Sequence, residues 1–574
     1  MSNEQIAQAF DELGDLLEIK GDSVFKIRAY HRAAENIRSL AEPVARLVQE
    51  DRLDEIPGVG EAIADKIHQL LTTGKIDTLE RLRQEVPPSL LELLQIPDLG
   101  PRRAGLFWRE AGIKDVNSLE TALREGRLAD LPGIGPKTEQ RLLAGIETYR
   151  QRSDRLPLAE AWPLAQEWLG WLRSLPQVKR AELAGSLRRH RTTVGDLDFA
   201  VASNSPEEIK KAFDAHAGVS RVLGQGENKI SVEIGSHTGL QVWIQPSERF
   251  GTLWLFTTGS RDHNIHLRQI ALQQNLSLSE QALTTDDGKE LLCAEEEEVY
   301  AKLGMPWIPP EMREDRGEIQ AALRKELPRL VEQEDLIADL HSHTTWSDGR
   351  NTIEEMARAA IQRGIRILAI TDHSAGLGVA GGLTVERLHQ QRDEIRKVQE
   401  KLGDDLLLLQ GSEVEIRTDG SLDFPDEALA DLDIVVAALH SGLRQPKQQV
   451  TQRLVRAMRN PHVDVIAHPS GRLFPNRPGA DLDWDSVLST AAETGVAMEI
   501  NAHPLRLDLE DIYARRAAEM GIPICINSDA HSPADFDNLP FGISQAKRAW
   551  LRPEQVINTW PAEKLRAWLS ARGK

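Results

Sequence analysis

The second half of the chain alternates short apolar runs with longer stretches of helical periodicity. The apolar runs lie at residues 336–340, 367–371, 406–411, 434–439, 463–467, 497–501 and 524–527. Helical stretches begin between them, at Thr352, Val385, Gln448, Asp485 and Leu509. Apolar strands that alternate with helices predict a parallel sheet buried on both faces. A run of about seven such strands favours a distorted β/α barrel, whose active site would lie at the carboxyl ends of the strands.

The middle of the chain has a different pattern. Strand-like runs at 179–183, 197–202, 229–234 and 240–244 are interleaved with helical stretches at 158–175 and 207–214. This order predicts an α+β domain. A small hairpin subdomain is expected at 276–304, with its acidic run, 295–298, at the solvated start of a helix.

The first 50 residues have helical periodicity throughout. The positions predicted to form the apolar faces are Ile6, Phe10, Leu13, Leu17, Phe25, Ile27, Tyr30, Ala33 and Ile37.

Three similar phrases follow, at residues 56–60, 96–100 and 131–135, each between two predicted helices. This is the helix-hairpin-helix pattern, in which glycines let the backbone approach a phosphate and the next helix offers free N–H groups and a positive dipole end. Such motifs bind the DNA backbone rather than read its sequence. The expected contacts are Gly58, Gly60, Gly100, Gly133, Gly135 and Lys137. The second phrase is expected to bind most weakly, because Asp98 replaces a glycine there.

Composition limits the class of protein. The 574 residues are enough for roughly three or four domains. No apolar run approaches the roughly 20 residues of a membrane span, and the N-terminus does not resemble a secretory signal. Two cysteines, Cys293 and Cys525, fit a reducing cytoplasm. The net charge of −20 disfavours a broad electrostatic grip on nucleic acid but allows local contacts through backbone amides. We therefore expect a cytoplasmic protein without a membrane partner.

A glycine turn, a basic segment and two carboxylates follow one another at residues 185–198. Asp196 and Asp198 alternate with apolar residues, so both carboxylates would project from one face of a strand. The turn is Gly185-Ser186, and the basic residues are Arg188, Arg189 and Arg191. This combination suits a site that holds Mg²⁺ and a polyphosphate.

Metal-binding side chains stand at or just beyond the ends of the predicted barrel strands. They are His341, His343, Asp348, His373, Glu413, His440, His468, Asp529 and His531. These side chains are ligands for Zn²⁺, Mn²⁺ or Fe²⁺, and the mixed set leaves the metal open. Their number implies two or three clustered metals bridged by an acid such as Glu413, which suits phosphoester hydrolysis. Arg472 and Arg506, on nearby loops, are expected to grip the phosphate.

Taken together, these motifs resemble those of the bacterial family X DNA polymerases with a C-terminal PHP (polymerase and histidinol phosphatase) domain. The family's nucleotidyltransferase motif is matched by Gly185, Ser186, Arg189, Gly195, Asp196 and Asp198, and its nucleotide-binding turn by Thr258, Gly259, Ser260 and Asn264. The barrel ligands match those of the PHP domain without exception. The resemblance implies a helical lyase-like domain with the first hairpin at 1–85, a helix-hairpin-helix region at 86–155, a palm and thumb at 156–304, a linker at 305–335 and the PHP domain at 336–574.

The resemblance also implies ligand groups and partners. It places His341, His343, Glu413 and Asp529 on one metal, Glu413, His440 and His468 on a second, and Asp348, His373 and His531 on a third. It implies Mn²⁺ or Zn²⁺ in the barrel, Mg²⁺ or Mn²⁺ on Asp196 and Asp198, and DNA and dNTP as partners of a monomer. Lys66 occupies the position of the lyase lysine of eukaryotic relatives, and the alternatives to a Schiff base there are that Lys66 contacts DNA or faces solvent.

The chain departs from the family at one catalytic position. Where the family has a third aspartate, on the strand before the nucleotide-binding turn, this chain has Gln241. Glutamine cannot accept the proton of a primer hydroxyl, and it removes a charge from the metal site. We therefore expect weak or absent polymerase activity beside a PHP domain that hydrolyses 3′-terminal nucleotides, 3′-phosphates or abasic sites. The alternatives are an active gap-filling polymerase in which Glu233 or another acid substitutes, with the PHP domain as proofreading exonuclease, and a DNA-binding scaffold with structural metals.

Overall fold

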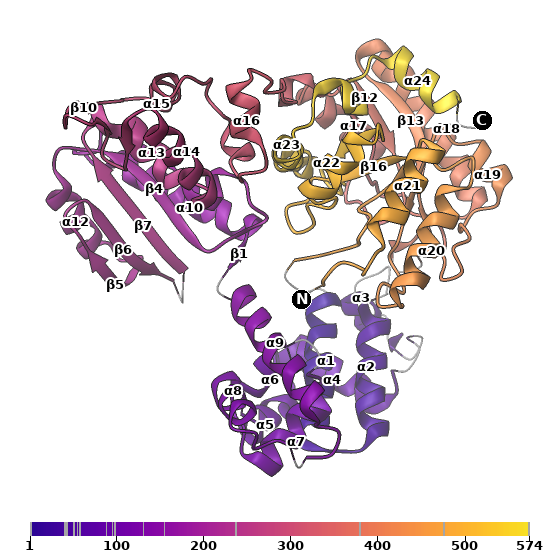
Figure 1. Cartoon of the computed structure of the whole chain (residues 1–574). Helices are drawn as coiled ribbons and strands as arrows, with labels where there is room; N and C mark the ends of the chain where they lie inside the picture. The colour runs from indigo at the N-terminus through magenta and orange to yellow at the C-terminus, as the bar shows by residue number, and fades with distance from the viewer. Residues whose placement is uncertain are drawn as a thin grey trace. The chain divides into compact units, whose positions relative to one another are not determined.

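The computed structural model describes residues 3–38, 44–49, 52–53, 56, 59–87, 89–94, 96, 99–129, 131–153, 155–235, 238–377, 380–474 and 477–571. The chain forms two compact units, one built from Met1–Ser153 and the other from Asp154–Leu377 and Gly381–Lys574. Figure 1 labels their elements. Among the residues so described, no helix is both long and apolar enough to cross a membrane.

The first unit, as far as it is described, is helical. Its helices are α1 (Asn3–Lys20), α2 (Val24–Arg38), α3 (Val44–Gln49), α4 (Glu61–Thr73), α5 (Asp77–Glu85), α6 (Ser89–Leu93), α7 (Pro101–Ala111), α8 (Val116–Arg124) and α9 (Pro136–Ser153). Their apolar faces share one core, which includes Phe10, Leu13 and Phe107. The prediction that Phe25 joins this core is wrong. Its side chain is 85% exposed, because it lies in the first turn of α2, outside the face that the later positions of the helix bury.

The second unit begins with a five-stranded sheet. Its spatial order is β2 (Arg180–Leu183), β4 (Asp196–Ala202), β7 (Thr238–Gln245), β6 (Lys229–Ile234) and β5 (Val219–Gln225). Only the central pair, β4 and β7, is parallel within this sheet. A short ladder of β1 (Leu156–Pro157) and β3 (Thr193–Val194) lies beside it, and α11 (Gly185–Arg188) follows β2.

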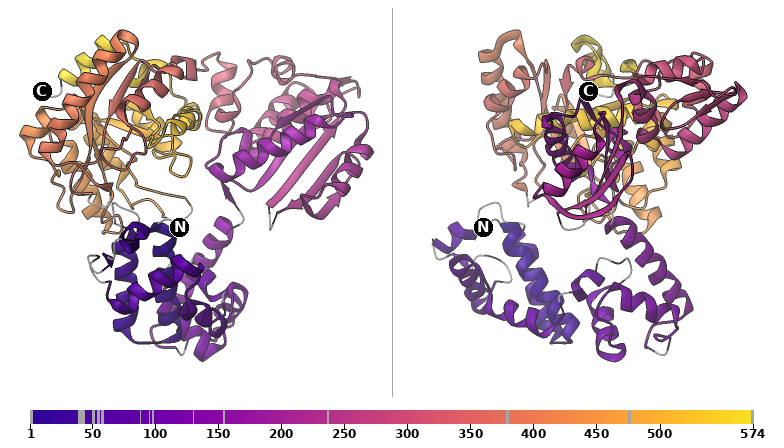
Figure 2. Two further views of the ribbon diagram at one scale, coloured as in Figure 1. Left: turned by 180° about the vertical axis from the view of Figure 1, so that it is seen from behind. Right: turned by 90° about the vertical axis from the view of Figure 1, so that its left-hand side faces the viewer.

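Alternation along β4 separates an apolar face from a polar one. Leu197 and Phe199 are fully buried in a cluster with residues of α10 (Leu158–Ser174) and α12 (Pro206–Ala215). The left view of Figure 2, which shows the molecule from behind, has α10 lying against the sheet. Asp196 and Asp198 therefore point to the opposite face. On that face Ala200 packs against α13 (Phe250–Thr258).

A smaller subdomain follows the sheet. It contains α14 (Arg261–Gln273), the three-stranded sheet of β8 (Leu276–Leu278), β9 (Leu283–Thr285) and β10 (Glu290–Leu291), α15 (Glu296–Lys302) and α16 (Glu318–Leu323). The expected solvation of the acidic run is wrong for Glu296, which is only 1% exposed. Its carboxylate is buried because Arg188 and Arg313 both pair with it, at 2.7 and 2.8 Å.

The segment expected as a linker is packed rather than loose. Ile308, Met312 and Ile319 are fully or almost fully buried in the core of the small subdomain. The guanidinium of Arg313 is fully buried as well, because Glu296 accepts two hydrogen bonds from it.

The remainder of the second unit confirms the predicted barrel. Seven parallel strands are neighbours in chain order: β11 (Ala338–Asp339), β12 (Ile367–Ile370), β13 (Leu407–Glu415), β14 (Ile434–Ala438), β15 (Val465–Ile466), β16 (Ala497–Asn501) and β17 (Ile524–Asn527). A parallel bridge between Ser342 and Ala530, just beyond β11 and β17, nearly closes the sheet. The accompanying helices are α17 (Ile353–Gln362), α18 (Val385–Leu402), α19 (Asp426–Ala430), α20 (Lys447–Met458), α21 (Trp484–Thr494), α22 (Asp511–Glu519), α23 (Leu539–Arg548) and α24 (Ala562–Ser570).

Candidate metal centre and nucleotide pocket

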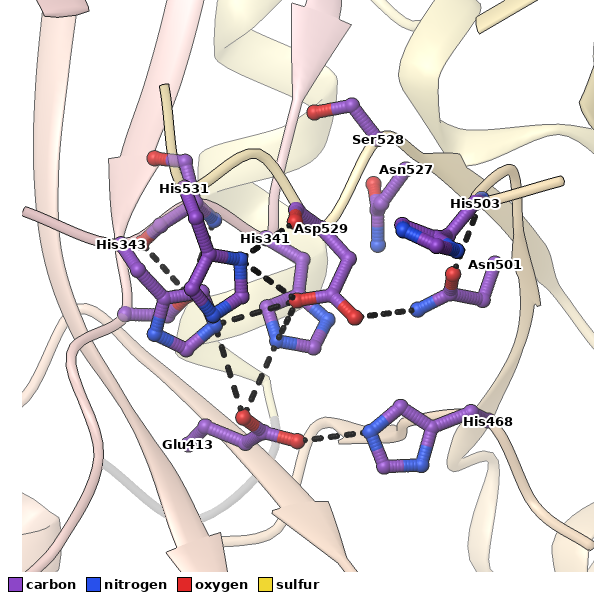
Figure 3. A network of polar contacts seen from close by, with 12 residues as sticks. His341, His343, Glu413, His468, Asn501, His503, Asn527, Ser528, Asp529 and His531 are labelled. Carbon is purple, nitrogen blue, oxygen red and sulfur yellow. Dashed lines mark hydrogen bonds and ion pairs between the residues drawn. The ribbon is translucent and has the colours of Figure 1, made fainter. Parts of the chain in front are cut away.

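The carboxyl ends of the barrel strands bring the predicted metal ligands together. Histidines follow β11, β12, β14, β15 and β17, and Glu413 lies in β13, which is longer than predicted. Figure 3 shows His341, His343 and His468 around the Glu413 carboxylate, with Asp529 on the far side of the first two rings. The Nε2 atoms of His341 and His343 lie 3.3 and 3.5 Å from Glu413 Oε2 and 3.6 and 3.2 Å from Asp529 Oδ1.

The other oxygen of Glu413 faces a second pair of histidines. Its Oε1 lies 3.2 Å from His440 Nε2 and 2.8 Å from His468 Nε2. The two oxygens of one carboxylate thus face two different sets of ring nitrogens, which is the geometry of a bridging ligand.

A third group surrounds Asp348. Its Oδ2 lies 3.4 Å from the Nε2 atoms of both His373 and His531. His373 also approaches the central carboxylate, because its Nδ1 is 3.0 Å from Glu413 Oε2. The structure therefore places together the side chains of all three groups that the family resemblance implies.

The buried atoms of this cluster fit metal ions. The Nε2 of His341, both ring nitrogens of His343 and the Nδ1 of His373 are buried without a hydrogen-bond partner in the described structure. Orphaned buried nitrogens are unfavourable, and coordination would satisfy them. Two ligands, each about 2.1 Å from one tetrahedral ion, lie about 3.4 Å apart, close to the separations found here.

A second layer of acids and amides orients these ligands. Glu499 Oε1 lies 2.8 Å from His341 Nδ1, and Glu415 Oε2 lies 2.8 Å from His440 Nδ1. Asn501 donates to Asp529 Oδ2 at 3.1 Å. Such contacts fix ring orientation and leave the other nitrogen for the metal. Sequence reasoning missed them, although Glu499 and Asn501 are polar residues inside an otherwise apolar strand.

Charges in the cluster shift the titration of its members. Burial opposes ionisation of Glu413, but His373, His440 and His341 hold its pKa well below the usual value. Burial likewise disfavours a charged imidazole at His440, yet Glu413 raises its pKa to about 9. For His531, burial is outweighed by the Asp348 contact, and its pKa also rises to about 9. Without metal, the cluster therefore retains protons that a metal must displace.

The two predicted phosphate-binding arginines occupy different places. Arg506 lies beside the centre, with Nε 3.5 Å from Asp529 Oδ2 and a buried Nη1 that has no hydrogen-bond partner within the described residues. Arg472 donates from Nε to the Arg506 carbonyl at 2.7 Å and pairs with Glu510 at 2.7 Å. The Arg472 guanidinium thus contacts the loop that carries Arg506.

A separate cavity of about 620 Å³ lies over the polar face of β4. Its lining includes the predicted Gly185, Ser186, Arg189, Gly195, Asp196, Asp198, Thr258, Gly259 and Asn264, together with Gln241. Ser260 instead caps α14, where its Oγ accepts a hydrogen bond from the His263 amide. Arg155, Arg261 and Arg268 also line the cavity. None of these three arginines was among the site residues predicted from the sequence, although Arg155 directly precedes β1, the partner of the strand that leads into Asp196.

Gln241 lies beside both carboxylates. Strand register pairs it with Asp198, and its Nε2 donates to Asp196 Oδ2 at 2.8 Å. Burial, together with the neighbouring Asp196, raises the pKa of Asp198 to about 7. Gly185 has a φ of +59°, and a Cβ there would come within 2.0 Å of Asp198 Oδ2, so only glycine fits this turn.

The hairpin glycines of the first unit leave the backbone open. Gly60 and Gly100 precede α4 and α7, and neither helix has a side-chain cap. A Cβ on Gly60, Gly100, Gly133 or Gly135 would meet no atom within 4 Å. Gly58 lies outside the described residues. Lys137 is exposed in the first turn of α9, and Lys66 Nζ donates to the Ala62 carbonyl at 2.9 Å.

Comparison with known proteins agrees with this architecture. The chain matches the helix-hairpin-helix domain at residues 1–76, the SAM-like helix-hairpin-helix tandem at 90–148, the DNA polymerase beta thumb at 253–314 and the PHP domain at 339–503. It is 36% identical over 572 residues to the DNA polymerase/3′-5′ exonuclease PolX of Bacillus subtilis (strain 168), covering 99% of both chains. It is 32% identical over 235 residues to a probable phosphatase of Thermoanaerobacter sp. (strain X514), covering 39% of this chain and 91% of that protein.

Helix-hairpin-helix domains, a DNA polymerase beta thumb and a PHP barrel in one chain define the architecture of a family X polymerase with a C-terminal PHP domain. With this full-length similarity, the chain belongs to the PolX family of DNA polymerase/3′-5′ exonucleases.

Proposed function

We propose that the barrel hydrolyses phosphodiester bonds at the 3′ ends of DNA with two or three divalent metals, Mn²⁺ or Zn²⁺. The observation that carries this proposal is the Glu413 carboxylate, whose two oxygens face different histidines at 2.8–3.5 Å. A structural metal needs only four ligands in a closed site, fewer than are gathered here. The names of the relatives, an exonuclease and a phosphatase, support the same chemistry. Terminal 3′-phosphates and abasic sites are further candidate substrates.

The residues of the barrel would bind and orient the substrate. Clustered metals, when bound, supply an activated water and stabilise the attacking and leaving oxygens of the displacement. Glu499 and Glu415 hold the rings of His341 and His440 with Nε2 toward the centre. Arg506 would donate its unpartnered Nη1 to a non-bridging phosphate oxygen.

For the nucleotide pocket we propose that Asp196 and Asp198 hold one Mg²⁺ or Mn²⁺ with a nucleotide or a DNA end, and that nucleotide addition is weak or absent. The Gln241 amide occupies an oxygen of Asp196 and accepts no proton. Loss of a general base alone costs roughly 10²–10⁴ in rate. The helical hairpins would deliver gapped, nicked or damaged DNA, which gives the protein a role in DNA repair.

An active gap-filling polymerase remains the second candidate. Beside Gln241, the cavity is lined by residues predicted to bind the nucleotide, such as Ser186, Arg189 and Gly259. The proposed substitute acid, Glu233, lies on the same face of the sheet, opposite Gly239. Its carboxylate pairs with Arg221 at 2.8 Å, on the side of β6 away from Asp196. This placement of Glu233 favours the proposal of weak polymerisation over the alternative in which Glu233 replaces the missing aspartate.

One paired assay tests both proposals. The purified chain receives a one-nucleotide gap substrate, dNTPs and Mn²⁺, and both extension and 3′-end degradation are measured. The double variant His341→Ala, Asp529→Ala is expected to lose degradation, and persistent degradation would place the nuclease elsewhere. Efficient extension that disappears in Asp196→Ala would instead establish the active polymerase.

A further inference from the structure

The loop between β16 and α22 carries Arg506 to the metal centre. Arg506 Nε lies 3.5 Å from Asp529 Oδ2, and its Nη1 is buried and unpartnered among the described residues. A guanidinium with a buried, unpartnered N–H group is suited to donate a hydrogen bond to a phosphate oxygen, provided that its loop holds one conformation.

Within the barrel, the side chain of Arg472 and the polar groups of Ser470 help to hold the loop. Arg472 donates to the carbonyl oxygens of both Arg506 and Leu507. Ser470 donates from its amide and hydroxyl to Asp508 Oδ2, at 3.0 and 2.9 Å. These contacts hold the backbone of the loop but make no use of the Leu507 side chain.

The Leu507 side chain is buried outside the barrel core. It is 0% exposed and belongs to the hydrophobic cluster of the five-stranded sheet, with Leu172 of α10 and Phe199 of β4. Its backbone has a φ of +45°, a left-handed conformation that is unfavourable for leucine and persists only where the surroundings enforce it. Burial of this apolar side chain is favourable and adds to the contacts that hold the loop in this conformation.

We propose that Leu507 is a positioning residue for Arg506. By inserting into the core of the polymerase palm, it holds the adjacent guanidinium toward a phosphate oxygen of DNA at the metal centre. The palm thereby sets how tightly the barrel binds its substrate. This inference rests on the proposed phosphodiesterase function of the barrel.

The test compares 3′-end hydrolysis of a fluorescent DNA oligonucleotide by full-length variants in Mn²⁺. Leu507→Ala is expected to raise KM roughly tenfold with a smaller change in kcat, because it weakens a charge-assisted contact to bound phosphate. Leu507→Met, which keeps the apolar anchor, should restore KM. The matched control is Leu172→Ala, which perturbs the same cluster at a residue of α10 outside the loop and should leave KM unchanged. Metal content, measured by mass spectrometry, should equal that of the wild type in every variant.

A double-mutant comparison separates positioning from general destabilisation. If Leu507 acts through Arg506, Leu507→Ala should add nothing to the KM of Arg506→Ala. A further tenfold rise in KM in the double variant would overturn the proposal, as would an equal effect of Leu172→Ala.

Leu507→Gly, which adopts the left-handed backbone without strain, replaces Leu507→Ala if the latter does not fold. Hydrolysis that survives His341→Ala would refute the proposed function of the barrel. If His341→Ala abolishes hydrolysis but Leu507→Ala has a normal KM, only the positioning role is refuted.

Discussion

At the scale of single residues, the proposal of weak or absent nucleotide addition rests on Gln241. The pocket keeps its glycine turn, its arginines and two carboxylates, but the amide of Gln241 donates to Asp196. A neutral amide that donates a hydrogen bond thus lies beside the two carboxylates. The pocket retains groups that bind phosphate while lacking a third negative charge.

Restoring that charge should restore nucleotide addition. Gln241→Asp is expected to raise extension of a one-nucleotide gap in Mn²⁺ by roughly 10²-fold or more, because it supplies a base and a metal ligand. Gln241→Ala serves as the control, since it frees Asp196 without adding charge. An equal gain in both variants would contradict the explanation and identify the hydrogen bond to Asp196 as the obstacle.

Two histidines make metal binding at the barrel sensitive to pH. In the metal-free protein His440 and His531 have pKa values raised to about 9, so both carry protons at pH 7. Each raised pKa stabilises the metal-free fold fully below the ordinary value near 6.5, and this contribution is lost as pH rises through about 9. Metal ions compete with these protons.

Metal affinity should therefore fall as pH is lowered, by up to about tenfold per pH unit for each proton displaced. Titration calorimetry with Mn²⁺ at pH 7, in buffers of different ionisation enthalpy, is expected to show proton release on binding. His440→Asn should reduce the number of protons released. A heat of binding independent of the buffer would contradict this assignment.

At the scale of elements, α15 is held by a buried ionic cluster at its first turn. Glu296 accepts hydrogen bonds from Arg188, Arg313 and the indole of Trp307. Arg188 also donates to Thr258 Oγ1 at 2.7 Å, so this cluster supports the wall of the nucleotide pocket. Burial opposes its charge, but the two arginines lower the pKa of Glu296 below the usual value.

Glu296→Gln should destabilise the second unit by about 3–5 kcal/mol, because it leaves two buried guanidinium groups without their counter-charge. Urea unfolding followed by tryptophan fluorescence measures the change. Because the folded-state pKa is depressed, the stabilisation is present above the ordinary pKa near 4.5 and is lost as pH falls below it, so the two proteins should converge in acid. The exposed Glu297→Gln is the control, with an expected change within about 0.5 kcal/mol.

The success of sequence-based prediction differs among elements for physical reasons. The barrel strands were predictable because strands covered on both faces are continuously apolar. The clustering of the candidate ligands was predictable because they stand at successive strand ends. β5 was missed because only its first residue is even partly buried, so it carries no apolar pattern. Glu296 was misjudged because the two arginines that neutralise it lie 17 and 108 residues away along the chain. The second-layer Glu499 was missed because periodicity does not show which neighbour a buried acid meets.

At the scale of the whole second unit, buried polar contacts of Arg548 join the barrel to the rest of the unit. Arg548 of α23 is buried and donates to the Arg189 carbonyl at 2.8 Å and to Glu314 at 2.9 Å. It also pairs with Asp511 at 2.8 Å, and Arg316 pairs with the same carboxylate at 2.9 Å. A barrel helix therefore holds the backbone of Arg189, a residue that lines the nucleotide pocket.

Arg548→Ala tests whether the barrel supports the pocket. Removing this guanidinium leaves Glu314 short of a partner and weakens the pairing of Asp511, so the second unit should lose about 3–5 kcal/mol of stability in urea unfolding. The affinity of the pocket for a dNTP in Mg²⁺, measured by calorimetry, should fall as well, because the Arg189 backbone loses its anchor. Arg552→Ala, which breaks an exposed pair with Glu554, provides the control and should change neither quantity measurably. Weaker nucleotide binding without loss of stability would assign Arg548 a local role at the pocket. Lost stability with unchanged nucleotide binding would show that the pocket binds nucleotide without support from the barrel.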